Sequence, residues 1–196
     1  RGNVEEGFKQ ADVIVEEKYK THLIQHTTLE PRVTVASWNG KRLTVWDSHK
    51  SPFRMRTAVA EALKLKINQV RFLTHYIGGD FGDKASLERQ HLLAALLTMK
   101  TNRPVKIEFT REENFLSAHH RYPTTWYLKY GAKKDGTLTA IQVKLFADSG
   151  AYYSIDGAAG SLEVAKYVYR CPNVRLEGFN VFTNKPEGGF MRCVGH

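Results

Sequence analysis

The strongest constraint on the fold of this chain is one glycine-rich segment, residues 77–84, with the sequence IGGDFGDK. Its glycines, Gly78, Gly79 and Gly82, permit backbone dihedral angles that other residues avoid and let the backbone approach a ligand. A strand-like run precedes the segment at 69–75, and an apolar helical pattern follows at 86–99. A glycine-rich turn that leads into a helix N-terminus presents N–H donors to an anionic ligand. The spacing matches neither a P-loop nor a dinucleotide fingerprint, and a tight connection without any ligand is the alternative.

The composition is that of a folded globular protein, with 42% apolar and 25% charged residues among 196. No apolar run approaches the roughly 20 residues that a membrane helix needs. The net charge of +9 favours anionic partners, but the basic residues are scattered and form no motif for binding nucleic acid. The two cysteines, Cys171 and Cys193, exclude a disulfide scaffold, and we expect a reducing, cytoplasmic environment.

Hydrophobic periodicity predicts an α+β fold in which long hairpins form antiparallel or mixed sheets and single helices pack on them. We expect either one lobe over 1–196 or two sublobes at about 1–110 and 111–196. The predicted strands are 12–19, 33–38, 43–46, 69–75, 105–109, 124–132, 137–148 and 173–184, and the predicted helices are 52–65, 86–99, a short one from 110, and 158–167.

Two pairs of residues that include histidines are weak candidates for a metal site. His22 and His26 are four residues apart, but a threonine pair and Pro31 argue against the helix that would bring them together. Glu88 and His91 have the spacing of one half of a carboxylate-bridged metal site, yet the chain lacks the second half. We therefore expect no direct metal ligand, and we interpret His91 as a packed core residue.

The chain ends on a second glycine-rich segment, which includes Gly188, Gly189 and Arg192. The guanidinium group of an arginine can hold an anion or an oxo group with two hydrogen bonds. A functional segment at a free terminus would fray, so we expect this chain to be a piece of a longer protein.

Four motifs in order are similar to the molybdenum-binding subunit of the xanthine dehydrogenase and aldehyde oxidase family, the molybdenum hydroxylases. They are the first segment, 1–12, then HTTLEP at 26–31, GGDFGDK at 78–84, and MRCVG at 191–195. The resemblance covers nearly the whole chain and corresponds to the first molybdopterin-binding lobe of a much longer subunit.

The resemblance implies an oxidoreductase that inserts a water-derived oxygen into a C–H bond of an aldehyde or an N-heteroaromatic compound. The implied cofactor is molybdopterin with molybdenum, in the cytosine dinucleotide form, and electrons would leave through 2Fe–2S and FAD groups on partner subunits or domains. The implied cofactor-binding residues are Gly78, Gly79, Phe81, Gly82 and Arg192. The implied substrate pocket includes Lys50, Phe81 and Val194.

Several residues depart from the family pattern. Lys50 stands where the family commonly has glutamine, and Asp80 and Asp83 replace loop glycines. Two carboxylates would repel an anionic cofactor unless they face away or pair with Lys84. Ala85 replaces the glutamate of purine-oxidising members, which argues against a purine substrate. Cys193 is interpreted as a structural or incidental cysteine.

The family's catalytic glutamate lies in its C-terminal part, outside this chain, so we expect 1–196 to be inactive alone and to bind no cofactor by itself. Two other hypotheses remain open. One is a module that binds a nucleotide or nucleic acid through its positive charge and glycine loop. The other is a non-catalytic relic whose glycine-rich segments are only tight turns.

Overall fold

The computed structural model describes residues 1–152, 157–189 and 191–192, with the backbone alone for 166 and 167. The chain divides into two compact units. We call His26–Ala118 the helix-covered unit and the combination of Arg1–Gln25 with His119–His196 the long-strand unit. The expected sublobe boundary near residue 110 therefore differs from this division, because the first 25 residues belong with the C-terminal part.

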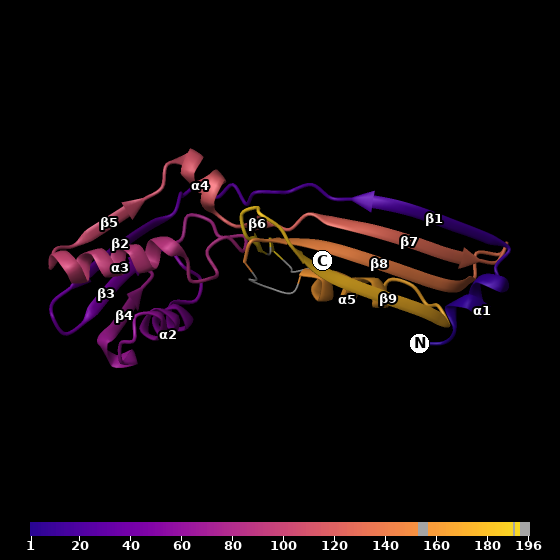
Figure 1. Cartoon of the computed structure of the whole chain (residues 1–196), viewed down its shortest axis with the longest axis horizontal. Helices are drawn as coiled ribbons and strands as arrows, with labels where there is room; N and C mark the ends of the chain where they lie inside the picture. Colours follow the sequence, from indigo (N-terminus) through magenta and orange to yellow (C-terminus); the bar gives the residue numbers. More distant parts are fainter. Residues whose placement is uncertain (153–156, 190, 193–196) are drawn as a thin grey trace. The chain divides into compact units, whose positions relative to one another are not determined.

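The helix-covered unit is built on a four-stranded sheet with the order β4-β3-β2-β5 (Figure 1). The β2–β3 and β2–β5 pairs are antiparallel, whereas β3 and β4 run parallel. The elements of this unit are β2 (Val33–Trp38), β3 (Leu43–Asp47), α2 (Pro52–Ala62), η1 (Ile67–Gln69), β4 (Val70–Leu73), α3 (Arg89–Thr101), β5 (Val105–Glu108) and α4 (Arg111–Ser117).

The core of this unit lies between one face of the sheet and the helices α2 and α3. Alternate strand residues face the helices because side chains in a strand have a period of two. They pack against one apolar side of each helix, as the 3.6-residue spacing of the sequence predicts. The buried residues are Ala36, Leu43, Val45, Val70 and Phe72 from the strands, Met55, Val59 and Ala60 from α2, and Ala94 and Ala95 from α3.

The long-strand unit contains a second four-stranded sheet, with the order β1-β7-β8-β9 (Figure 1). The first two pairings are antiparallel and the β8–β9 pairing is parallel, with α5 in the crossover between these strands. The elements of this unit are α1 (Val4–Lys9), β1 (Val13–Lys20), β6 (His120–Arg121), β7 (Thr124–Ala132), β8 (Leu138–Gly150), α5 (Gly157–Tyr167), β9 (Asn173–Phe182) and β10 (Gly188–Gly189).

The core of this unit follows the alternation of β8. Ile141, Val143 and Leu145 are buried and belong to one cluster with Ala158 and Leu162 of α5. The opposite face of the sheet is polar and aromatic, since Tyr127 lies across from Lys144 and Phe146 lies across from Phe179. One face is thus packed and the other is open within the described residues.

The α+β prediction is confirmed, and every predicted strand and helix is present with shifts of a few residues at its ends. The main difference concerns α3, which begins at Arg89 rather than near Ser86. The Glu88 amide donates to His91 Nδ1 at 2.9 Å, so a capping box sets the first turn there. The glycine-rich segment therefore does not lead directly into a helix N-terminus, and that part of the sequence argument was wrong.

Candidate functional site

Glu30 is hydrogen-bonded to the start of the glycine loop, which we define as Gly78–Lys84. The Gly78 amide donates to Glu30 Oε2 at 2.8 Å, and the Glu30 amide donates to the Gly78 carbonyl at 3.1 Å. A Cβ atom at Gly78 would lie 2.4 Å from the Glu30 Cβ, so only glycine fits this close approach. The motif that contains Glu30 therefore positions the loop by direct contact.

Lys84 ties the end of the loop to the same carboxylate. Its side chain is buried, and Nζ donates to Glu30 Oε2 at 2.5 Å and to Ser48 Oγ at 3.0 Å. Partial burial acts to raise the pKa of Glu30, but the hydrogen bonds from Lys84, Gly78 and Ser48 outweigh it and lower the pKa below its ordinary value. Glu30 is therefore ionised at neutral pH.

The turn that contains Lys50 meets the loop at the same point. The Lys50 amide donates to the Lys84 carbonyl at 3.3 Å, and the Lys50 side chain is exposed. Three segments that are remote in sequence, at Glu30, at 48–50 and at 78–84, thus converge inside the helix-covered unit.

Both loop carboxylates are engaged by groups of the protein itself. Asp80 Oδ1 accepts hydrogen bonds from the amides of Gly82 and Lys84, at 2.8 and 2.9 Å, and so closes the turn from within. Asp83 is buried and accepts from Arg32 Nη2 at 2.7 Å. Of the two arrangements that the sequence left open, pairing of an aspartate side chain with the Lys84 ammonium is wrong, because Lys84 binds Glu30 and Arg32 neutralises Asp83.

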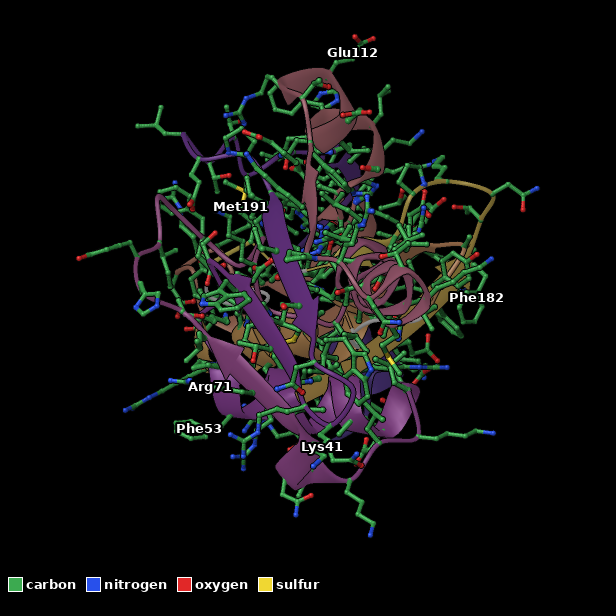
Figure 2. All side chains as sticks on the ribbon, turned by 90° about the vertical axis from the view of Figure 1, so that its left-hand side faces the viewer. Lys41, Phe53, Arg71, Glu112, Phe182 and Met191 are labelled. Carbon is green, nitrogen blue, oxygen red and sulfur yellow. The ribbon has the colours of Figure 1, made fainter. Side chains whose placement is uncertain are left out.

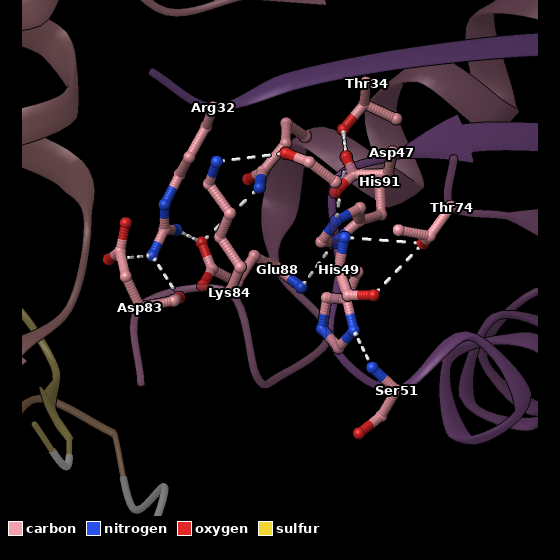
Figure 3. A network of polar contacts seen from close by, with 12 residues as sticks. Arg32, Thr34, Asp47, His49, Ser51, Thr74, Asp83, Lys84, Glu88 and His91 are labelled. Carbon is pink, nitrogen blue, oxygen red and sulfur yellow. Dashed lines mark hydrogen bonds and ion pairs between the residues drawn. The ribbon is translucent and has the colours of Figure 1, made fainter. Parts of the chain in front are cut away.

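Arg32, at the entrance to β2, joins the loop to α3 (Figure 3). Its guanidinium group donates to the carboxylate and the carbonyl of Asp83 and forms an ion pair with Glu88, the residue that caps α3. All three groups lie in a region of low exposure, where an unpaired charge is costly. Arg32 was not singled out from the sequence; an arginine directly after the His26–Pro31 motif was the only available signal.

Three residues of the loop adopt left-handed backbone conformations, namely Gly79 (φ +106°), Gly82 (φ +101°) and Phe81 (φ +52°). A left-handed phenylalanine is unusual, and its side chain remains 47% exposed. Within the described residues, the amides of Gly79 and Asp80 have no hydrogen-bond partner. The loop therefore presents free backbone donors beside one exposed aromatic ring.

Two buried histidines lie behind the loop (Figure 3). His49 accepts a hydrogen bond from the Ser51 amide at Nδ1, and His91 Nε2 lies 3.3 Å from Asp47 Oδ2. Burial, followed by the repulsion of His91, lowers the pKa of His49 to about 4, although Asp47, the Ser86 backbone and Asp80 oppose the shift. His91 is 2% exposed, and its interpretation as a packed core histidine agrees with this position.

The second glycine-rich segment belongs to the long-strand unit. Gly188 and Gly189 form β10, which pairs with β6 in parallel. A Cβ at Gly189 would lie 2.4 Å from the His119 ring, and one at Gly188 would lie 2.7 Å from the Asp148 carbonyl, so close packing accounts for both glycines. Arg192 is exposed with φ +56°, while Cys193 and Val194 lie outside the described residues.

The structure defines an α+β protein whose glycine loop is held by the Lys84–Glu30 and Arg32–Asp83 ion pairs. A family model for a molybdopterin cofactor-binding domain matches residues 1–196. The chain therefore belongs to the molybdopterin cofactor-binding domain family, which confirms the resemblance seen in the sequence.

Similar proteins agree with this assignment. The chain is 39% identical to the nicotinate dehydrogenase large molybdopterin subunit of Eubacterium barkeri over 99% of its length, and 37% identical to a probable xanthine dehydrogenase subunit of Bacillus subtilis. It matches the crystal structure of quinoline 2-oxidoreductase from Pseudomonas putida 86 over its full length, with a TM-score of 0.94 and 28% identity. The chain spans 46%, 26% and 26% of these three proteins, respectively.

Proposed function

We propose that the glycine loop binds the pterin part of a molybdenum cofactor, and that the chain is the first cofactor-binding lobe of a larger molybdenum hydroxylase. The observation that carries the proposal is the arrangement of polar groups in the loop. Among the described residues, its amides at Gly79 and Asp80 donate to no acceptor, while its two carboxylates are engaged by backbone donors and by Arg32. Such a loop suits an anionic ligand rich in hydrogen-bond acceptors.

The residues that would hold the cofactor are Gly78, Gly79 and Gly82 through their backbone, Phe81 through its ring, and Arg192 through its guanidinium group. When bound, the cofactor supplies the redox-active metal for oxidising a C–H bond of an aldehyde or an N-heteroaromatic compound with water-derived oxygen. The protein residues orient it: Glu30 and Lys84 fix the loop, and the partners of Asp80 and Asp83 reduce repulsion. No residue in this proposal is a direct metal ligand.

The proposal extends to the cofactor form and the partners. We infer the cytosine dinucleotide form, with FAD and 2Fe–2S groups on partner subunits or domains, and a cytoplasmic location. The names of the similar proteins, a molybdopterin subunit and a molybdenum-containing CO dehydrogenase among them, support a multi-part enzyme. Among the described helices, none combines the length and the apolar character that crossing a bilayer requires.

The cofactor proposal is tested on the full-length protein, produced in a host that makes molybdopterin. Replacing Gly79→Val puts a branched side chain at a left-handed position beside the free amides, and we expect molybdenum and pterin content to fall at least about tenfold, which corresponds to ~1.4 kcal/mol of binding. The measurement is elemental analysis together with fluorescence of the oxidised pterin. Gly136→Val is the control, since Gly136 also has a positive φ but lies in an open hairpin turn.

Unchanged molybdenum in the Gly79→Val protein would contradict the loop as the binding site. A wild-type protein without molybdenum would instead support the cofactor-free relic.

We also propose that Lys50 and Phe81, with Val194, border the substrate. A cation in place of a neutral amide favours a substrate with a negative charge, such as a heteroaromatic carboxylate. In the full-length enzyme, Lys50→Gln should raise KM for nicotinate about fivefold or more while leaving KM for a neutral heteroaromatic aldehyde within about twofold, if Lys50 contributes a charged hydrogen bond worth ~1 kcal/mol. Equal changes for both substrates would count against this role.

A further inference from the structure

An open groove runs along the outer edge of β4, on the helix-covered unit. Its volume is about 540 Å³. One wall is the continuous stretch from Val70 to Thr74, and the opposite wall is the start of α2, with Pro52, Phe53 and Arg56. We call it the β4 groove. It is separate from the glycine loop, because no residue of Gly78–Lys84 lines it.

The backbone of β4 is available in this groove. In the sheet order β4-β3-β2-β5 it is an end strand, paired only with β3 within the described residues. An end strand presents a row of N–H and C=O groups that another extended segment can pair with. Its short length, four residues, limits such pairing to a few hydrogen bonds, so side-chain contacts must supply selectivity.

Three arginines supply a uniform charge. Arg42, Arg56 and Arg71 line the β4 groove, and none of its lining residues is acidic. The guanidinium group of Arg56 lies 5.8 Å from the centre of the Phe53 ring, and its Nε is buried without a hydrogen-bond partner among the described residues. Figure 2 shows Arg71 and Phe53 next to each other, and both line the groove.

Apolar groups lie between these charges. Phe53 is 77% exposed, and Ile67 and Leu73 also line the groove. Charged side chains and a short length commonly protect an end strand from unwanted pairing. Three arginines around an exposed aromatic ring exceed that need, and they are complementary to alternating acidic and apolar side chains.

We propose that the β4 groove is a docking site for an extended, acidic segment of a partner chain. The segment pairs with the outer edge of β4, directs carboxylates to Arg42, Arg56 and Arg71, and packs an apolar side chain on Phe53. This interaction surface is independent of the cofactor proposal, since it uses none of the residues assigned to the loop.

The test places a photo-reactive group in the groove of the full-length protein, purified with any chains that accompany it. Phe53→p-benzoylphenylalanine is irradiated, and the cross-linked peptide is identified by mass spectrometry. We expect a peptide from a partner chain in which acidic and apolar residues alternate. The double variant Arg56→Glu/Arg71→Glu, made in the protein that carries the probe at position 53, should reduce the cross-link yield at least about tenfold. The new glutamates would repel the carboxylates of the acidic segment.

The matched control is Arg54→Glu, on the same helix but not lining the groove, which should change the yield less than about twofold under the same conditions. Arg71→Glu alone, at an exposed position, serves if the double variant does not fold, as judged by circular dichroism. The proposal is overturned by the absence of any cross-linked peptide, by a peptide without acidic residues, by a peptide from this protein's own polypeptide or a second copy of it, or by a yield that charge reversal does not change.

Discussion

His49 is held in its neutral form by its surroundings. Its side chain is 1% exposed, with the rings of Phe72 and His91 each about 6 Å away between centres. A protonated His49 ring would be shielded from water and would lie beside the imidazole ring of His91. Because protonation is unfavourable there, the pKa of His49 is about 4 in the folded protein, whereas it has the ordinary value near 6.5 in the unfolded chain.

The lowered pKa makes stability depend on pH. Between pH 6.5 and 4 the unfolded chain binds the proton and the folded protein does not, so the stabilising effect is complete above pH 6.5 and is lost as the pH falls towards 4. We expect His49 to account for a loss of roughly 2 to 3 kcal/mol of unfolding free energy over this range. Urea unfolding at pH 7, 5.5 and 4 measures it.

The comparison variant for this test is His49→Asn, whose side-chain oxygen can still accept from the Ser51 amide. It should flatten the pH dependence, while the same change at exposed His75 should leave it as in the wild type. A wild-type slope that persists in His49→Asn would show that other groups cause it.

A second prediction concerns the effect of a substitution at Gly78 on stability. An alanine methyl group at Gly78 would collide with Glu30, so we expect Gly78→Ala to lower the unfolding free energy by about 1 to 3 kcal/mol in urea unfolding experiments. Gly40→Ala is the control for backbone effects, because Gly40 has φ +85° and open space around it, and should cost only about 1 kcal/mol. If Gly78→Ala were neutral, the close contact between Glu30 and the loop would be wrong.

At the scale of elements, Arg32 connects the entrance of β2, the glycine loop and the start of α3. Replacing it removes the arginine partner of the buried Asp83 carboxylate and one of the partners of Glu88. We expect Arg32→Met to cost about 3 to 5 kcal/mol of unfolding free energy, the usual effect of breaking a buried ion pair.

Adding Asp83→Asn to Arg32→Met should restore part of that stability, because it removes the more deeply buried of the two carboxylates that had paired with Arg32. Denaturant unfolding of the single and double variants measures the coupling. Additive losses would indicate that the two residues do not interact.

The elements themselves were predictable because periodicity and turn chemistry are local. The predicted strands 33–38 and 43–46 pair as neighbours, and the short helix predicted from 110 is present as α4. The partner of Lys84 was not predictable, because Glu30, Asp80 and Asp83 all offered carboxylates and only the fold selects among them. The role of Arg32 likewise depends on a contact between residues 51 positions apart, which no local pattern encodes.

At the scale of the whole molecule, the helix-covered unit is continuous in sequence and has its own core. We expect residues 26–118 expressed alone to fold, and to unfold cooperatively in urea when followed by circular dichroism, with an m-value of about 1 kcal/mol per molar urea. A gradual, non-cooperative change would show that its core depends on the other unit. The long-strand unit should behave differently, since a piece that begins at residue 119 lacks β1.

The pairing of β1 with β7 also bears on protein synthesis. On the ribosome, β1 emerges about 100 residues before its partner, and at 5–20 residues per second this interval is roughly 5 to 20 seconds. During that time the entire helix-covered unit is translated and can fold. The backbone of Val13, Ile14 and Val15 has no β7 to pair with in this interval. We therefore expect residues 13–20 of the nascent chain to stay unpaired, and accessible to chaperones, during this interval.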